Sequence, residues 1–265
     1  MSNDPIAIFD SGLGSLSIIK ELRSVIPSEN IIYLADTKNF PYGTKSPERL
    51  REIMIRTIKS LEFYEPKLII VASYTPSVQC LTSIKKCTSV PVLGIKPPLA
   101  KAALLTKKGH IGIMATESTL QSNQLQQQIA KELPQKIFVS KINASPLIET
   151  IEDCSFINSS KVRKSVMQET LGAPPRDNID VIALCSTHLT LIKDYFDSLY
   201  SNIIFIDATR NAAKDAEKFL KDGNILKKAR PRKTRVFTTG DKKSFHDVLE
   251  QMGFKYKVEA FHASI

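Results

Sequence analysis

The chain has 265 residues, 42% of them hydrophobic, and a formal net charge of +10. This length and hydrophobic content suffice for one large core or two medium ones, whereas the longest apolar runs, such as residues 68–72, are far too short to span a bilayer. The four cysteines show no CxxC spacing and no ligand pattern with the four histidines, which argues against disulfides and zinc and predicts a reducing, cytoplasmic location.

Apolar runs and amphipathic segments alternate along the whole chain. Residues 1–5 lead directly into the first apolar run, so we expect neither a signal peptide nor a transit peptide. Amphipathic segments separate most of the predicted strands, which fall at residues 6–9, 31–34, 68–72, 91–95, 111–114, 137–141, 180–184, 203–206 and 235–237. This alternation predicts an α/β fold in which helices cover parallel sheets.

Two parts of the chain carry a similar pattern. Residues 6–11 (IAIFDS) resemble residues 111–116 (IGIMAT), and residues 69–75 (IIVASYT) resemble residues 181–187 (VIALCST). Each half therefore begins with a strand and a polar turn, and later has a strand followed by serine and threonine. We predict two α/β units whose facing strand ends bring these two serines to opposite walls of one cleft.

An ordered series of motifs, running from residue 6 to about residue 245, resembles the glutamate racemase family of cofactor-independent aspartate/glutamate racemases. The motifs are FDSGLG (9–14), ADT (35–37), PYGTKS (41–46), PVLGI (91–95), KAA (101–103), IGI (111–113) with Thr116 and Thr119, and TTGD (238–241). The resemblance implies two similar parallel-sheet domains related by pseudo-two-fold symmetry, formed by residues 1–97 plus 208–265 and by residues 98–207. It also implies a cleft between the domains in which the α-carbon of glutamate is inverted without a cofactor.

Both positions that hold a catalytic thiol in this family are serines here. Ser73 takes the first position and Ser186 the second, while Tyr74 replaces a small amide and either fills the pocket or reshapes it for another ligand. A thiol serves as acid and as base because its pKa, about 8.5, is easily lowered, whereas a serine hydroxyl needs an adjacent base. We therefore expect slow turnover at best. The alternatives are a non-catalytic carboxylate-binding or regulatory homologue, and a relative with changed chemistry, such as a decarboxylase, isomerase or hydrolase.

Polar residues follow several predicted strands, at the sheet edge where α/β proteins bind ligands. Hydroxyl groups and helix N-termini there suit a small amino acid or dicarboxylate. For proton transfer the candidates are Ser73, Ser186, Asp10, His188 and Glu152, with Glu149 as a rival to Glu152 for the place of the family's glutamate. For substrate binding they are Ser11, Pro41, Tyr42, Gly43, Tyr74, Thr75, Thr116, Thr119 and Thr187.

Some of these residues have a structural interpretation as well. Ser73 and Ser186 could serve only as helix N-caps, and His188 could either orient a ligand or be structural. We expect Cys185 to be a small buried hydrophobic residue rather than a displaced catalytic thiol, because a shift of one residue along a strand turns the side chain to the other face. Gly12 and Gly14 are interpreted as backbone requirements of the first turn.

A basic run occupies residues 227–235. Such a run could bind nucleic acid or an anionic surface, but it lacks interleaved aromatic residues and a recognition motif, so we interpret it as a solvated loop. The absence of a P-loop, a GxGxxG and an HExxH motif predicts no nucleotide, pyridoxal phosphate or metal cofactor. We expect no membrane partner, and homodimer formation stays open.

Overall fold

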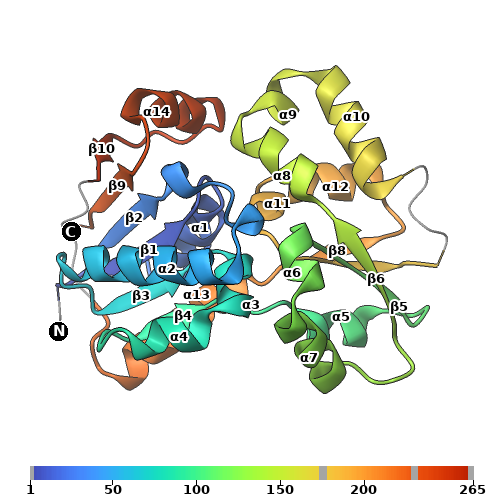
Figure 1. Cartoon of the computed structure of the whole chain (residues 1–265), viewed down its shortest axis with the longest axis horizontal. Helices are drawn as coiled ribbons and strands as arrows, with labels where there is room; N and C mark the ends of the chain where they lie inside the picture. Colours follow the sequence, from blue (N-terminus) through green and yellow to red (C-terminus); the bar gives the residue numbers. More distant parts are fainter. Residues whose placement is uncertain (1–2, 173–177, 228–231, 262–265) are drawn as a thin grey trace.

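The computed structural model describes residues 3–172, 178–227 and 232–261, and its strands form two sheets in which every pairing is parallel (Figure 1). Residues 228–231 of the basic run lie outside the described residues, so the prediction for that run stays a prediction. No helix in the described part of the chain combines the length and the apolar character needed to cross a membrane.

The first sheet has six strands in the order β10-β9-β2-β1-β3-β4. These strands are β1 (Ile6–Asp10), β2 (Ile31–Ala35), β3 (Leu68–Val71), β4 (Val92–Gly94), β9 (Thr234–Thr238) and β10 (Val258–Ala260). The helices of this part are α1 (Ser15–Val25), α2 (Pro47–Glu62), α3 (Tyr74–Gln79), α4 (Leu81–Lys86), α13 (Thr209–Asp222) and α14 (Lys242–Gln251), with two 3₁₀ turns, η1 (Thr37–Asn39) and η2 (Tyr42–Thr44).

Helices cover both faces of the first sheet, which explains why its strands are apolar at nearly every position. Alternate residues of β1 point to opposite faces. Ile6 and Ile8 pack with α1, α13 and α14, whereas Ala7 and Phe9 pack with α2 and α4. Local signals start α2, because Ser46 accepts a hydrogen bond from the Arg49 amide and Pro47 takes the first helical position.

The second sheet has four strands in the order β6-β5-β7-β8. They are β5 (His110–Ala115), β6 (Phe138–Asn143), β7 (Val181–Leu184) and β8 (Ile204–Ile206). The helices of this part are α5 (Leu99–Leu105), α6 (Glu117–Gln121), α7 (Asn123–Glu132), α8 (Ser145–Glu152), α9 (Ser155–Asn158), α10 (Ser160–Leu171), α11 (Thr187–Leu191) and α12 (Lys193–Leu199). One hydrophobic cluster continues from the first sheet into the second, so the two units share a core.

The two sheets repeat one topology. The order β2-β1-β3-β4 in the first corresponds to β6-β5-β7-β8 in the second, so β1 matches β5 and β3 matches β7, as the sequence repeat predicted. All nine predicted strands are present. The prediction missed β10, a three-residue edge strand that follows α14. Because β9 and β10 pair within the first sheet and α13 packs against α1, the last part of the chain returns to the first unit. The division at residues 97/98 and 207/208 stays a prediction.

Candidate functional site

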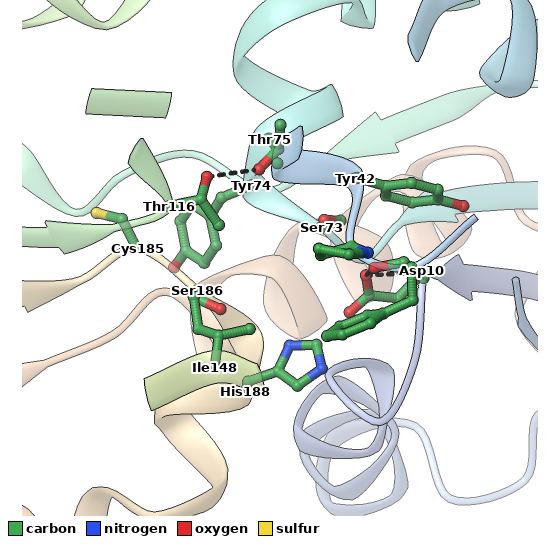
Figure 2. Close-up of a pocket in the computed structure, with 14 residues that line it drawn as sticks. Asp10, Tyr42, Ser73, Tyr74, Thr75, Thr116, Ile148, Cys185, Ser186 and His188 are labelled. Carbon is green, nitrogen blue, oxygen red and sulfur yellow. Dashed lines mark hydrogen bonds between the residues drawn. The ribbon is translucent and has the colours of Figure 1, made fainter. Parts of the chain in front are cut away.

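The carboxyl ends of β1, β3 and β7 face a small cavity between the two sheets (Figure 2). Its volume is about 20 Å³, which is room for roughly one water molecule. Most predicted site residues line it: Asp10, Ser11, Pro41, Tyr42, Gly43, Ser73, Tyr74, Thr75, Thr116, Ser186 and His188. Glu152, Thr119 and Thr187 lie behind this wall and bond to residues of it. Three lining residues were not predicted as site residues: Phe40 and Ile148, whose apolar side chains carry no chemical signal, and Cys185, which was expected to be a buried hydrophobic residue.

Ser73 and Ser186 occupy equivalent places in the two units. Ser73 precedes α3 and Ser186 precedes α11, and both have extended backbones, with φ of −134° and −145°. Both are N-cap residues by position, yet neither side chain makes a capping hydrogen bond. Neither hydroxyl is hydrogen-bonded to any residue within the described ranges. The purely capping interpretation is therefore wrong for the side chains, which leave two unpartnered hydroxyl groups on the wall of one cavity.

Asp10 is the buried carboxylate of the site. Its Oδ1 accepts from the Ser11 amide at 2.6 Å, and its Oδ2 lies 3.0 Å from the Thr187 hydroxyl. Burial raises the pKa of Asp10, against the opposing effect of His188 and these hydrogen bonds. The Thr187 hydroxyl also lies 3.1 Å from the Ala72 carbonyl, so Asp10 and Ala72 share this donor.

Glu152 and His188 form a second polar pair. His188 Nε2 lies 2.8 Å from Glu152 Oε2, which also accepts from the Leu13 amide at 2.8 Å. Burial lowers the pKa of His188, but the hydrogen bond and charge of Glu152, with the charge of Asp10, outweigh it and raise the pKa. The Phe40 ring packs on the imidazole with centroids 5.9 Å apart. Glu149 is exposed, so Glu152 is the glutamate that reaches the site.

Gly12 and Gly14 are required by close approach and not by an unusual backbone conformation, which corrects the interpretation from sequence. Gly14 has helical angles, φ −54° and ψ −36°, and neither residue has a positive φ. A Cβ atom on Gly12 would lie 2.1 Å from Glu152 Oε1, and one on Gly14 would lie 2.1 Å from Asp10 Oδ2. The two carboxylates therefore pack directly against the backbone of the turn after β1, at positions where only glycine fits.

Three threonine hydroxyls join the two units on one side of the cavity. Thr75 in α3 lies 3.0 Å from Thr116 and 3.1 Å from Thr119, and the latter two are 2.9 Å apart. Figure 2 shows the bond between Thr75 and Thr116. Gly43 packs tightly against the same place, since a Cβ atom there would lie 2.8 Å from that of Thr116. The hydroxyls predicted to bind a ligand thus bond to one another in this closed arrangement.

Tyr74 and Cys185 are both buried, with different consequences. The Tyr74 hydroxyl accepts from the Ala208 amide at 3.2 Å, so the phenol fills space between α3 and the start of α13. The Cys185 sulfur points away from Ser186 and His188 in Figure 2, and burial raises the pKa of this thiol far above its ordinary value. Cys185 belongs to the hydrophobic core, as expected from its place beside Ser186.

Asp36 supports the segment that covers the cavity, a role that the sequence analysis did not assign. Its Oδ2 accepts from the Tyr42 hydroxyl at 3.0 Å, its Oδ1 from the Thr239 hydroxyl at 2.9 Å, and both from the Asn39 amide. Tyr42 is thereby fixed against the cavity. Within the described ranges no group of three or more His, Cys, Asp or Glu side chains is arranged to hold a metal ion.

Comparison with known proteins agrees with this fold. Residues 16–216 match the family model described as Asp/Glu/Hydantoin racemase. A glutamate racemase of Streptococcus thermophilus is 30% identical over 257 residues, which cover 95% of this chain and 93% of that protein. The glutamate racemase isoform RacE1 of Bacillus anthracis aligns with a TM-score of 0.87 at 27% identity, covering 99% of this chain and 98% of that one. The glutamate racemase of Francisella tularensis, solved in complex with D-glutamate, aligns with a TM-score of 0.85 at 28% identity, covering 100% and 99% of the two chains.

Proposed function

Because the chain belongs to the glutamate racemase family, we propose that it binds glutamate or a related small amino acid in the cavity between its two sheets and exchanges the α-proton only slowly. One observation carries the proposal: Ser73 and Ser186 line the same cavity from equivalent positions of the two units. A ligand held between them presents one face of its α-carbon to each serine. The site therefore keeps the arrangement that inversion requires, with weaker groups at the two reacting positions.

The polar groups around the cavity suit an amino acid. Hydroxyl groups of Ser11, Thr75 and Thr116 can donate to a carboxylate, and Asp10 in its ionised form can accept from an ammonium group. The closed cavity of about 20 Å³ is far smaller than a glutamate molecule. Binding therefore requires the two units to separate, which breaks the contacts of Thr75 with Thr116 and of Leu13 with Glu152.

The serines limit the chemistry. Inversion needs a base on one face of the α-carbon and an acid on the other, and a positioned acid–base group typically contributes about 10²–10⁴-fold in rate. A serine hydroxyl becomes a useful base only when another base removes its proton. Neither Ser73 nor Ser186 is hydrogen-bonded to a carboxylate or an imidazole among the described residues, so the hydroxyls remain ordinary alcohols.

The unpartnered hydroxyls of Ser73 and Ser186 also bear on the alternative functions, a hydrolase and a non-catalytic binding protein. Ser186, His188 and Glu152 are the residue types of a hydrolytic triad. His188 Nε2 bonds Glu152, but no hydrogen bond joins Ser186 to His188 in the described part of the chain, so a hydrolase with a Ser186 nucleophile has weaker support. The second candidate is a non-catalytic binding protein, which the two unactivated hydroxyls favour directly.

One experiment separates these functions. The purified protein is incubated with L-glutamate or D-glutamate in deuterated water, loss of the α-proton is followed by NMR, and binding is measured by calorimetry. We expect binding in the millimolar range or tighter with slow exchange. Binding without any exchange would favour the non-catalytic candidate. Fast racemisation, or the absence of binding to glutamate, aspartate and simple dicarboxylates, would contradict the proposal.

A further inference from the structure

A second hollow, about 410 Å³ in volume, lies between α2 and the turns that follow β2 and β9. We call it the α2 pocket and define it by Asp36, Lys38, Arg49, Arg56, Thr57 and Ser60. Its volume falls within the range of about 300–1,000 Å³ that is usual for small-molecule sites. It has no lining residue in common with the cavity between the sheets, so the two are separate places on the molecule.

Positive charge dominates the rim of the α2 pocket. Lys38, Arg49 and Arg56 stand against a single lining carboxylate, Asp36, both of whose oxygens already accept hydrogen bonds from the protein. Arg49 is paired with Glu52 at 3.0 Å in an exposed ion pair. Arg56 forms no ion pair with any residue of the described ranges. Arginine and lysine together in one hollow favour an oxyanion such as a phosphate or a carboxylate.

Two unpartnered hydroxyls on largely buried residues of the wall are a second feature that suits a ligand, independent of the charges. Thr57 is 8% exposed and Ser60 is 6% exposed, and neither hydroxyl is hydrogen-bonded to a described residue. Buried hydroxyls in a helix ordinarily bond to a carbonyl of the preceding turn or to another partner. Neither oxygen is among the side-chain atoms that are fully buried without a partner, so both hydroxyls are open to the pocket and can bond to a ligand there. Apolar contacts complete the wall, since Leu34, Ile53 and Phe261 lie beside them.

We propose that the α2 pocket binds an organic anion whose phosphate or carboxylate group meets Arg56, Lys38 and Arg49 and whose apolar body packs on Ile53 and Phe261. Thr57 and Ser60 supply hydrogen bonds from the wall. The proposal does not depend on the function of the other cavity. The two places are nevertheless connected, because Asp36 lines the α2 pocket and holds the hydroxyl of Tyr42, which lines the cavity.

The test is calorimetric titration of the purified full chain with phenyl phosphate, benzoate, inorganic phosphate and benzyl alcohol. We expect phenyl phosphate or benzoate to bind at one site per chain, and whichever binds more tightly identifies the preferred oxyanion. That ligand should bind more tightly than inorganic phosphate and benzyl alcohol, because it alone uses both the rim and the apolar wall. Saturating L-glutamate should not compete with it.

Matched variants of α2 make the assignment specific. Arg56→Gln should weaken the preferred ligand about tenfold, as expected for the loss of a charged hydrogen bond, and Ser60→Ala should weaken it by a smaller factor. Arg51→Gln removes an exposed cation of the same helix outside the pocket and should leave affinity unchanged. Equal loss in Arg51→Gln and Arg56→Gln would reveal non-specific attraction to a basic chain and overturn the proposal. Competition by glutamate, or the absence of binding by every probe, would overturn it as well.

Discussion

The hydroxyl of Thr187, at the start of α11 in the second unit, lies 3.0 Å from Oδ2 of Asp10, at the end of β1 in the first. This contact joins residues 177 positions apart and places a hydroxyl against a fully buried carboxyl group. Burial between the two closed units opposes ionisation of Asp10 and raises its pKa. The protonation of Asp10 is therefore linked to the closed arrangement.

Asp10→Asn should make the chain less sensitive to pH. The folded-state pKa of Asp10 is raised, so the folded chain holds this proton more tightly than the unfolded chain, and the wild type loses stability as pH rises above about 4. Asparagine cannot ionise, yet its amide oxygen can still accept a hydrogen bond from Thr187. We expect the stability of Asp10→Asn relative to the wild type to increase between pH 4 and pH 7 in urea unfolding. A constant difference across this range would contradict the raised pKa.

Glu152→Gln should also gain stability relative to the wild type as pH rises, but over a higher pH range than Asp10→Asn. The pKa of His188 is raised in the folded chain, so the stabilisation from its protonation is fully present below about pH 6.5 and is lost as pH rises through the folded value. The substituted glutamine would keep a hydrogen bond but remove the charge. The wild type should therefore exceed this variant in stability most clearly near pH 5.5, and the difference should shrink by pH 8.5. Urea unfolding at pH 5.5 and at pH 8.5 measures this difference in stability. A difference that grows with pH would refute the pairing of Glu152 with His188.

The two serines can be tested by restoring thiols. Ser73→Cys combined with Ser186→Cys should raise the rate of glutamate racemisation, on the order of 10²–10⁴-fold for a competent acid–base group. Each single variant should gain little, because one face of the α-carbon would still lack an acid or a base. Adding Tyr74→Asn should raise the rate further if the phenol restricts the ligand.

Cys185→Ala is the control for this series, because its thiol is already buried beside Ser186. Its rate should equal that of the wild type. Loss of activity in this control would instead identify Cys185 as the working thiol.

Gly14→Ala tests the close approach of α1 to the site. The new Cβ atom would lie 2.1 Å from Asp10 Oδ2 and 2.2 Å from the Thr187 hydroxyl, so the two side chains must separate. Overpacking of this kind typically costs about 1–3 kcal/mol in the free energy of unfolding, and ligand binding should weaken as well. Ser15→Ala is the neighbouring control, since the Ser15 hydroxyl is buried without a hydrogen-bond partner in the described part of the chain, and its loss should not destabilise. Equal stability of Gly14→Ala and the wild type would show that the turn is not tightly packed.

The local and periodic features of this protein could be predicted from its sequence. Buried parallel strands such as β1 are continuous apolar runs, and the repeat of IIVASYT in VIALCST placed Ser73 and Ser186 after equivalent strands. Both features depend on neighbouring residues, so the fold class and the presence of a serine after each of two equivalent strands follow from the chain alone. The prediction missed β10 because three residues with a central glutamate carry almost no pattern.

Contacts between distant residues were decided only by the tertiary structure. The choice of Glu152 over Glu149 depends on which side chain reaches His188 and the Leu13 amide, and two glutamates within one helix have no distinguishing local pattern. The steric role of Gly14 likewise depends on Asp10 and Thr187, which approach it from two different units. Such contacts arise when separate elements pack together, because packing brings specific atoms within a few ångströms of one another while leaving no period or motif in the sequence.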